Sequence, residues 1–70
     1  MIKVYSKSNC IGCMATTKQL DRQGVEYELL KVPPTVIPEH LSEYKQLPIV
    51  DTGEEHWSGF LPEKLAALNA

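Results

Sequence analysis

Hydrophobic and polar residues alternate in two segments near the start of the chain, residues 2–6 and residues 25–32. Alternation of this kind predicts β-strands whose two faces meet different surroundings. In the first segment Ile2 and Val4 fall on one face, and Lys3 and Tyr5 fall on the other. We therefore expect a strand at each of these two segments.

The residues between the two predicted strands follow a helical spacing instead. Cys13, Thr17, Leu20 and Gly24 recur at spacings of four, three and four, so they share one face of a helix that ends near residue 23. Gly24 suits the position after a helix, because glycine adopts the left-handed conformation at no steric cost. A strand, a helix and a second strand predict a parallel pair joined by a right-handed crossover.

The second half of the chain is punctuated by proline. Prolines at positions 33, 34 and 38 indicate an extended connection over residues 33–38, and Pro38 fits the start of a short second helix over residues 39–45. The runs 47–50 and 54–57 flank a turn at residues 51–53, which predicts a β-hairpin. Pro62 fits the first position of a last helix, whose buried face carries Leu65 and Leu68.

The predicted order β-α-β-α-β-β-α is the order of a thioredoxin-like α/β domain. We expect a single domain over residues 1–70, acting as a monomer, with a four-stranded mixed sheet flanked by three helices. The chain is 43% hydrophobic and 23% charged, which is ordinary for a globular domain.

Charge and hydropathy exclude several classes of function. The net charge is −2 and there is no basic run, so the chain has no electrostatic footprint for nucleic acid. No apolar stretch is long enough to span a membrane. Residues 1–4 lead directly into the first strand with no signal peptide, so we expect a cytoplasmic protein.

Both cysteines lie in the motif Cys10-Ile11-Gly12-Cys13 at the start of the first predicted helix. A disulfide that closes so small a loop removes little chain entropy, so a redox role is favoured over a stabilising one. The helix N-terminus stabilises a thiolate at Cys10, and Lys7 adds a cation nearby. We expect Cys10 to be the catalytic nucleophile and Cys13, deeper in the helix, to be the resolving thiol, with no metal and no cofactor beyond this redox-active disulfide.

Two further segments are candidates for partner binding. Gly12 leaves room for the backbone of a partner and Ile11 offers an apolar contact. In thioredoxin-like domains the strand facing the Cys-X-X-Cys motif begins with a cis-proline, so we expect a cis Leu47–Pro48 bond. That bond would place the Leu47 backbone beside Cys10, where it can pair with an extended partner segment.

The stretch Trp57-Ser58-Gly59-Phe60 forms a corner between the last predicted strand and the last helix. Its two aromatic residues predict an apolar docking patch. Small domains also use aromatic rings to fill their cores, so we expect one ring to be buried and the other to be partly exposed.

These features together resemble the glutaredoxin-like NrdH-redoxins. The matching stretches are VYSKSNC (4–10), LDRQGVEY (20–27) and HWSGFLPEKL (56–65). The resemblance implies a thioredoxin fold and a dithiol carrier that takes electrons from thioredoxin reductase and donates them to ribonucleotide reductase, for the synthesis of deoxyribonucleotides. It also implies weak binding of glutathione, because the Trp57-Ser58-Gly59-Phe60 stretch stands where glutaredoxins carry glutathione-contacting residues.

The chain departs from the family pattern in three places. Gly12 stands where the family more often has a polar residue such as Gln, and Leu61 stands where it often has Arg. The segment over residues 32–47 is short, rich in proline and lacks the usual Gly-aromatic pair before the cis-proline. The last two departures bear on partner docking.

Two alternative functions have their own sequence signatures. A glutathione-dependent glutaredoxin would share the fold but use another electron donor. A small zinc-binding module would use Cys10, Cys13, His40 and His56, although the two histidines are too far apart in sequence for the usual zinc pattern. We expect both histidines to be surface side chains.

Overall fold

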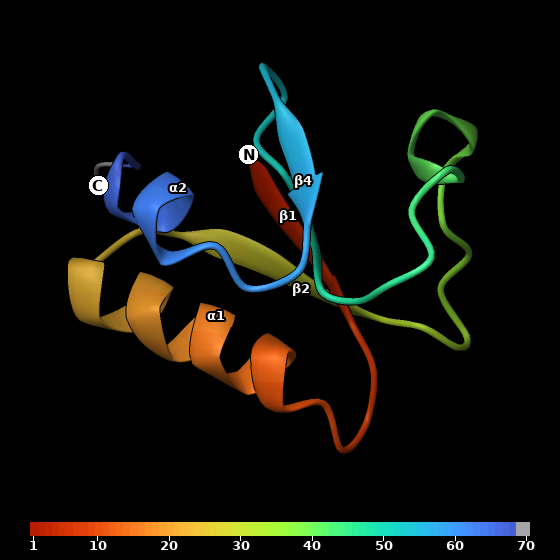
Figure 1. Ribbon diagram of the computed structural model, residues 1–70, viewed down its shortest axis with the longest axis horizontal. Coiled ribbons are helices and arrows are strands. Elements are labelled where there is room, and N and C mark those ends of the chain that lie inside the picture. The colour runs from red at the N-terminus through yellow and green to blue at the C-terminus, as the bar shows by residue number, and fades with distance from the viewer. Residues whose placement is uncertain (69–70) are drawn as a thin grey trace.

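The computed structural model describes residues 1–68, in which four strands, two α-helices and one 3-10 helix follow one another along the chain (Figure 1). The elements are β1 (Ile2–Ser6), α1 (Ile11–Gln23), β2 (Tyr27–Lys31), η1 (Glu39–Leu41), β3 (Ile49–Asp51), β4 (His56–Ser58) and α2 (Pro62–Ala66). Over these residues, neither helix has the length and apolar character that crossing a membrane requires.

The four strands form one mixed sheet in the order β2-β1-β3-β4. β1 pairs with β2 in parallel, and α1 is the crossover between them, as the spacing of the apolar residues predicted. β3 pairs antiparallel with both β1 and β4, so the predicted hairpin is also present. Gly53 in the hairpin turn has a φ of 93°, a conformation that favours glycine.

One face of the sheet is covered by α1 and α2, which lie side by side (Figure 1). The core between helices and sheet consists of six buried residues: Val4, Leu20, Val25, Val50, Trp57 and Leu65. On α1 the buried residues are Cys13, Thr16 and Leu20, so Thr16 completes the inner face where the sequence pattern placed Thr17. Gly24 ends the helix with a φ of 73°, as predicted.

Gln23 attaches α2 to α1. Its side-chain amide donates hydrogen bonds to the carbonyl oxygens of Leu65, at 2.9 Å, and Leu68, at 3.0 Å. Leu65 lies in α2 and Leu68 lies two residues beyond the end of this helix, so both bonds hold the C-terminal end of α2. Gln19 adds a third bond, to the carbonyl oxygen of Pro62 at 3.1 Å. The short α2 is therefore fixed at both of its ends.

The other face of the sheet is covered by the segment between β2 and β3. Tyr5, Leu41 and Ile49 form its buried centre, and Tyr44 and Leu47 pack against them. The helix predicted over residues 39–45 is wrong, because only the three residues of η1 are helical and they form a 3-10 turn. The fold thus has two α-helices and a 3-10 turn where three helices were predicted.

The hydrogen bonds of this segment explain why no α-helix forms. The amide groups of Leu41, Ser42 and Tyr44 each donate to the carbonyl three residues earlier, at 3.0 to 3.1 Å, which is the 3-10 pattern. The Ser42 hydroxyl also donates to the carbonyl oxygen of Glu39 at 2.7 Å. Serine side chains that bond to the local backbone in this way compete with helix formation.

Two further sequence predictions need correction. The second strand is shorter than expected, because it starts at Tyr27 and Val25 instead donates its N–H to the carbonyl oxygen of Leu20 at 3.0 Å. The proline segment begins with a turn instead of an extended chain. In this turn the Thr35 N–H donates to the carbonyl oxygen of Lys31 at 2.9 Å.

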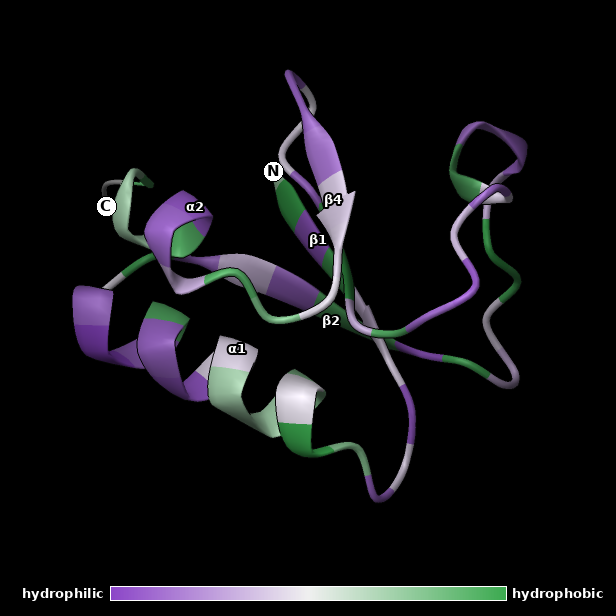
Figure 2. Cartoon of the chain, in the orientation of Figure 1, coloured by the Kyte–Doolittle hydropathy of each residue, from purple (hydrophilic) through white to green (hydrophobic). Residues whose placement is uncertain are grey.

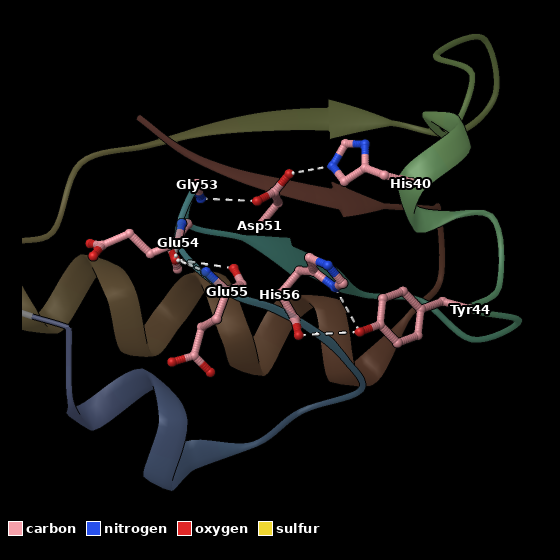
Figure 3. A network of polar contacts seen from close by, with 8 residues as sticks. His40, Tyr44, Asp51, Gly53, Glu54, Glu55 and His56 are labelled. Carbon is pink, nitrogen blue, oxygen red and sulfur yellow. Dashed lines mark hydrogen bonds and ion pairs between the residues drawn. The ribbon is translucent and has the colours of Figure 1, made fainter.

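Polar side chains fasten the segment around η1 to β3 and β4 (Figure 3). His40 Nε2 lies 3.0 Å from Oδ2 of Asp51 on β3. The Tyr44 hydroxyl lies 2.8 Å from Nδ1 of His56 on β4 and donates to the His56 carbonyl oxygen at 3.2 Å. The two histidines are thus exposed at the surface, as expected, but both hold the covering segment against the sheet.

Replacing Gln23 with Ala should destabilise the fold. The two hydrogen bonds from Gln23 to the carbonyl oxygens of Leu65 and Leu68 are lost, and each contributes about 1 kcal/mol, so we expect the free energy of unfolding to fall by about 1–2 kcal/mol. Urea denaturation followed by circular dichroism measures this change. The matched control is Lys18→Ala, which shortens an exposed side chain on the same helix. Equal stability of the two variants would contradict the assigned role of Gln23.

Asp51 should make the stability of the fold sensitive to acid. Its partial burial acts to raise the pKa, but hydrogen bonds from His40 and the Gly53 N–H, together with the charges of His40 and His56, outweigh burial and hold the pKa below the ordinary 3.8. A carboxylate whose pKa is lowered in the folded state stabilises the fold at pH values above its ordinary pKa. This stabilisation is lost as the pH falls through the folded-state pKa.

We therefore expect wild type to be more stable than Asp51→Asn near neutral pH, and the difference to vanish well below pH 4. Urea denaturation at a series of pH values measures both curves. Glu54→Gln is the control, because it neutralises an exposed carboxylate on the same hairpin. A constant difference between wild type and Asp51→Asn down to acid pH would refute the role of the carboxylate charge.

Candidate disulfide site

Cys10 is the residue that caps the N-terminus of α1. Its backbone is extended, with φ −114° and ψ 108°, and its carbonyl oxygen accepts the first helical hydrogen bond from the Met14 N–H at 3.1 Å. Its Sγ accepts the N–H of Cys13 at 3.1 Å. The sulfur therefore takes the place that a serine or aspartate oxygen has at most helix starts, where free N–H groups favour negative charge.

Cys10 and Cys13 form a disulfide, with their Cα atoms 5.2 Å apart. Cys10 is 7% exposed and Cys13 is 4% exposed, so Cys13 is the less accessible of the two, as expected, although both are largely covered. The helix start around them is apolar, whereas the later turns of α1 are polar (Figure 2).

The backbone before β3 lies directly beside this disulfide. The carbonyl oxygen of Leu47 is 3.8 Å from Sγ of Cys10, and the Leu47–Pro48 bond is cis, as predicted. Two hydrogen bonds from the connection between β4 and α2 hold this backbone in place. The Ser58 hydroxyl donates to the Gln46 carbonyl oxygen at 2.8 Å, and the Gly59 N–H donates to the Pro48 carbonyl oxygen at 2.8 Å.

A groove of about 540 Å³ opens at Cys10. Besides Cys10, its lining includes five of the residues that the sequence assigned to partner binding: Ile11, Gly12, Leu47, Pro48 and Phe60. Lys7, Asn9, Lys45 and Gln46 complete its lining. Ile11 is 86% exposed and Phe60 is 39% exposed, so two apolar side chains at the groove are open to a partner.

Trp57 does not belong to the exposed patch that the sequence predicted. Its ring is 5% exposed and packs in the core beneath the helices, so of the two aromatic rings Trp57 is the buried one and Phe60 the open one. Ser58 and Gly59 also lie outside the groove lining and act on it through their bonds to the backbone of Gln46 and Pro48.

Gly12 packs closely against Pro48 of its own chain. A Cβ atom added there would lie 3.3 Å from Cδ of Pro48 and 3.8 Å from Cβ of Phe60. The space beside Gly12 is therefore filled by this chain itself, and the absent side chain lets the start of α1 approach Pro48.

Sequence reasoning missed three residues of the groove, Asn9, Lys45 and Gln46. Asn9 has a φ of 56° and turns the chain into the helix. Lys45 and Gln46 were missed because a helix was predicted up to residue 45. Their position immediately before Leu47-Pro48 is the signal that places them beside Cys10.

Cys13 contacts a second, smaller pocket of about 100 Å³. Its other lining residues come from β1, β2 and α1 and from the loop between β1 and α1: Ser6, Lys7, Met14, Thr17, Leu29 and Lys31. The disulfide is thus flanked by one cavity at each sulfur, and Lys7 lines both.

The zinc-binding alternative required the histidines to meet the cysteines. Instead His40 and His56 contact each other, with ring centroids 5.9 Å apart, and bond to Asp51 and Tyr44 (Figure 3). Within residues 1–68, no three His, Cys, Asp or Glu side chains are placed to hold one metal ion.

A Cys-X-X-Cys disulfide that caps the first helix of such a sheet, with the backbone of a cis-proline segment beside it, defines a thiol-disulfide redoxin of thioredoxin fold. Comparison with known proteins then gives the family. The glutaredoxin-like protein NrdH of Salmonella typhimurium is 32% identical over an alignment of 71 positions, which covers 97% of this chain and 88% of that protein. The chain belongs to the NrdH family of glutaredoxin-like redoxins.

Further relatives agree with this assignment. The NrdH protein of Lactococcus lactis subsp. lactis is 27% identical, with 97% of this chain and 99% of that protein covered. The structure of NrdH-redoxin from Escherichia coli superimposes with a TM-score of 0.83 at 30% identity, covering 99% of this chain and 95% of that one. A glutaredoxin of Archaeoglobus fulgidus superimposes with a TM-score of 0.78 at 28% identity, covering 96% of this chain and 83% of that one. No protein-family model matches the chain.

Proposed function

We propose that this protein is a dithiol electron carrier that is reduced by thioredoxin reductase and that reduces ribonucleotide reductase. The observation that carries the proposal is the Cys10–Cys13 disulfide at the N-terminus of α1, with the Leu47 carbonyl oxygen 3.8 Å from the Cys10 sulfur in an open groove. Cys10 is the nucleophile and Cys13 is the resolving thiol.

In the first step the Cys10 thiolate attacks one sulfur of a disulfide in the partner. A bond forms between Cys10 and that sulfur, the partner's disulfide breaks, and its other sulfur leaves as a thiolate that takes a proton from water. The N–H of Cys13, which is 3.1 Å from Cys10 Sγ, and the helix N-terminus stabilise the attacking anion. The Leu47 carbonyl is placed to accept an N–H from an extended partner segment.

In the second step the Cys13 thiolate attacks Cys10 Sγ. The Cys10–Cys13 disulfide forms, the mixed disulfide breaks, and the second partner thiol is released, so two electrons have passed to the partner. The fixed separation of 5.2 Å between the two Cα atoms keeps Cys13 within reach of Cys10. The reductase then returns two electrons and two protons to the carrier.

Family membership supports the choice of donor and acceptor. The Escherichia coli NrdH-redoxin is described as glutaredoxin-like with a thioredoxin-like activity profile. In addition, Trp57-Ser58-Gly59-Phe60 stands where glutaredoxins carry residues that contact glutathione, and this stretch lacks their acidic residues. Both points favour a protein reductase over glutathione as the electron donor.

Substitution of the two cysteines separates their roles. Cys10→Ser should abolish disulfide reduction, because no nucleophile remains at the groove. Cys13→Ser should still complete the first step and accumulate a mixed disulfide with a peptide or protein disulfide. Intact-mass spectrometry of each variant, incubated with an oxidised substrate, measures the adduct. Accumulation on Cys10→Ser, with none on Cys13→Ser, would reverse the two roles.

The electron donor is tested by insulin-disulfide reduction with two supplies in parallel. One supply is NADPH with thioredoxin reductase, and the other is NADPH with glutathione and glutathione reductase. We expect turnover with the first, and turnover at least about tenfold slower with the second, which corresponds to about 1.4 kcal/mol in the barrier. The double variant Cys10→Ser/Cys13→Ser is the blank for both assays. Turnover with glutathione alone would make the protein a glutaredoxin.

A further inference from the structure

Four of the seven basic residues have an acidic residue as a strand neighbour, as an ion-pair partner or in the lining of a shared surface pocket. Lys3 is paired across the sheet with Glu28 and Asp51, and Lys64 Nζ lies 2.7 Å from Oε1 of Glu55. Lys18 and Arg22 share a surface pocket with Asp21. These four leave three of the seven basic residues, Lys7, Lys31 and Lys45 (7 − 4 = 3).

The three remaining lysines all lie around the disulfide. Lys7 and Lys45 line the groove at Cys10, and Lys7 and Lys31 line the pocket at Cys13. All three side chains are exposed, and neither of the two ion pairs found within residues 1–68 includes any of them. Neither cavity has an Asp or Glu among its described lining residues.

The strand topology explains this separation of charge. β1 and β2 are parallel, so Lys7, just after β1, and Lys31, at the end of β2, come out at the same edge of the sheet as the disulfide. The antiparallel β3 pairs its last residue, Asp51, with Lys3 at the start of β1. The hairpin turn with Glu54 and Glu55 therefore lies at the opposite edge from the start of α1 (Figure 1).

We propose that the partner segment reduced at Cys10 is an extended peptide with acidic residues beside its disulfide. The inference rests on the proposed function, because it describes what occupies the same groove. Carboxylates on the peptide would lie near Lys7 and Lys45 while the peptide backbone runs along Leu47. Exposed lysines that form no ion pair in the described residues attract a negative segment, and they speed its encounter with the disulfide even though the whole chain carries a net charge of −2.

The test uses three synthetic peptides that share one Cys-X-X-Cys disulfide and differ only in flanking residues, which are acidic, neutral or basic. Each peptide oxidises the reduced protein, so one peptide disulfide becomes a dithiol as the Cys10–Cys13 disulfide forms. Acid quenching and chromatography give the second-order rate constant. Rates are compared at about 0.01 M and about 1 M salt, where the screening lengths are about 30 Å and about 3 Å.

At low salt we expect the acidic peptide to react about tenfold faster than the basic one, and the ratio to approach one at high salt. The triple variant Lys7→Gln/Lys31→Gln/Lys45→Gln should lose the preference at low salt. Lys18→Gln, which removes an exposed lysine on the later part of α1, should keep it. Circular dichroism checks that all variants are folded.

Equal rates for the three peptides in wild type at low salt would overturn the inference and leave the proposed function intact, since exchange itself would be seen. A preference that survives in the triple variant would also overturn it, because other charges would then be responsible. No exchange with any peptide would reject the proposed function together with this inference.

Discussion

The contact between the start of α1 and the backbone before β3 is the interaction on which the rest of the site depends. Gly12 allows this contact, because a Cβ atom there would lie 3.3 Å from Pro48. The same contact puts the Leu47 carbonyl 3.8 Å from the Cys10 sulfur. A helix N-terminus that favours an anion and the backbone that we propose as the binding place of a partner segment thereby meet at the Cys10 sulfur.

The support for that backbone is mostly polar and comes from β3 and β4. Ser58 and Gly59 hold the carbonyls of Gln46 and Pro48. Further back, Tyr44 bonds to His56, and His40 bonds to Asp51. The segment around η1 forms only a 3-10 turn and no α-helix. Side-chain hydrogen bonds to the sheet therefore do part of what helix packing does on the other face.

Charge adds a second level of organisation to the same scaffold. The parallel pair β1–β2 delivers Lys7 and Lys31 to the edge of the sheet where α1 begins, and the hairpin turns its glutamates to the opposite edge. In a chain with a net charge of −2, the two cavities beside the disulfide are thus lined by three lysines and by no described acidic residue. In the interaction that we propose, the exposed apolar side chains of Ile11 and Phe60 supply contact area, and the lysines act at longer range through their charge.

The sequence by itself determined the features that depend on neighbouring residues. The spacing from Cys13 to Gly24 marked α1, alternation marked β1, and Pro62 marked the start of α2, because each signal is a local steric or periodic property. Cys10 at the helix start followed from these, and so did the parallel β1–β2 pair. Only the position of Pro48 beside Cys10 needed knowledge of related folds.

The tertiary structure alone decided which side chains meet. It replaced the helix expected at residues 39–45 with a 3-10 turn, buried Trp57, and brought Lys45 and Gln46 to the groove. It also showed that Gly12 makes room for Pro48 of its own chain. The lining of the groove and the contact between Gly12 and Pro48 depend on packing between residues far apart in the chain, as with Cys10 and Leu47, which are 37 positions apart. Local propensity carries no information about such contacts, because the free energy that selects them comes from burial in the assembled fold.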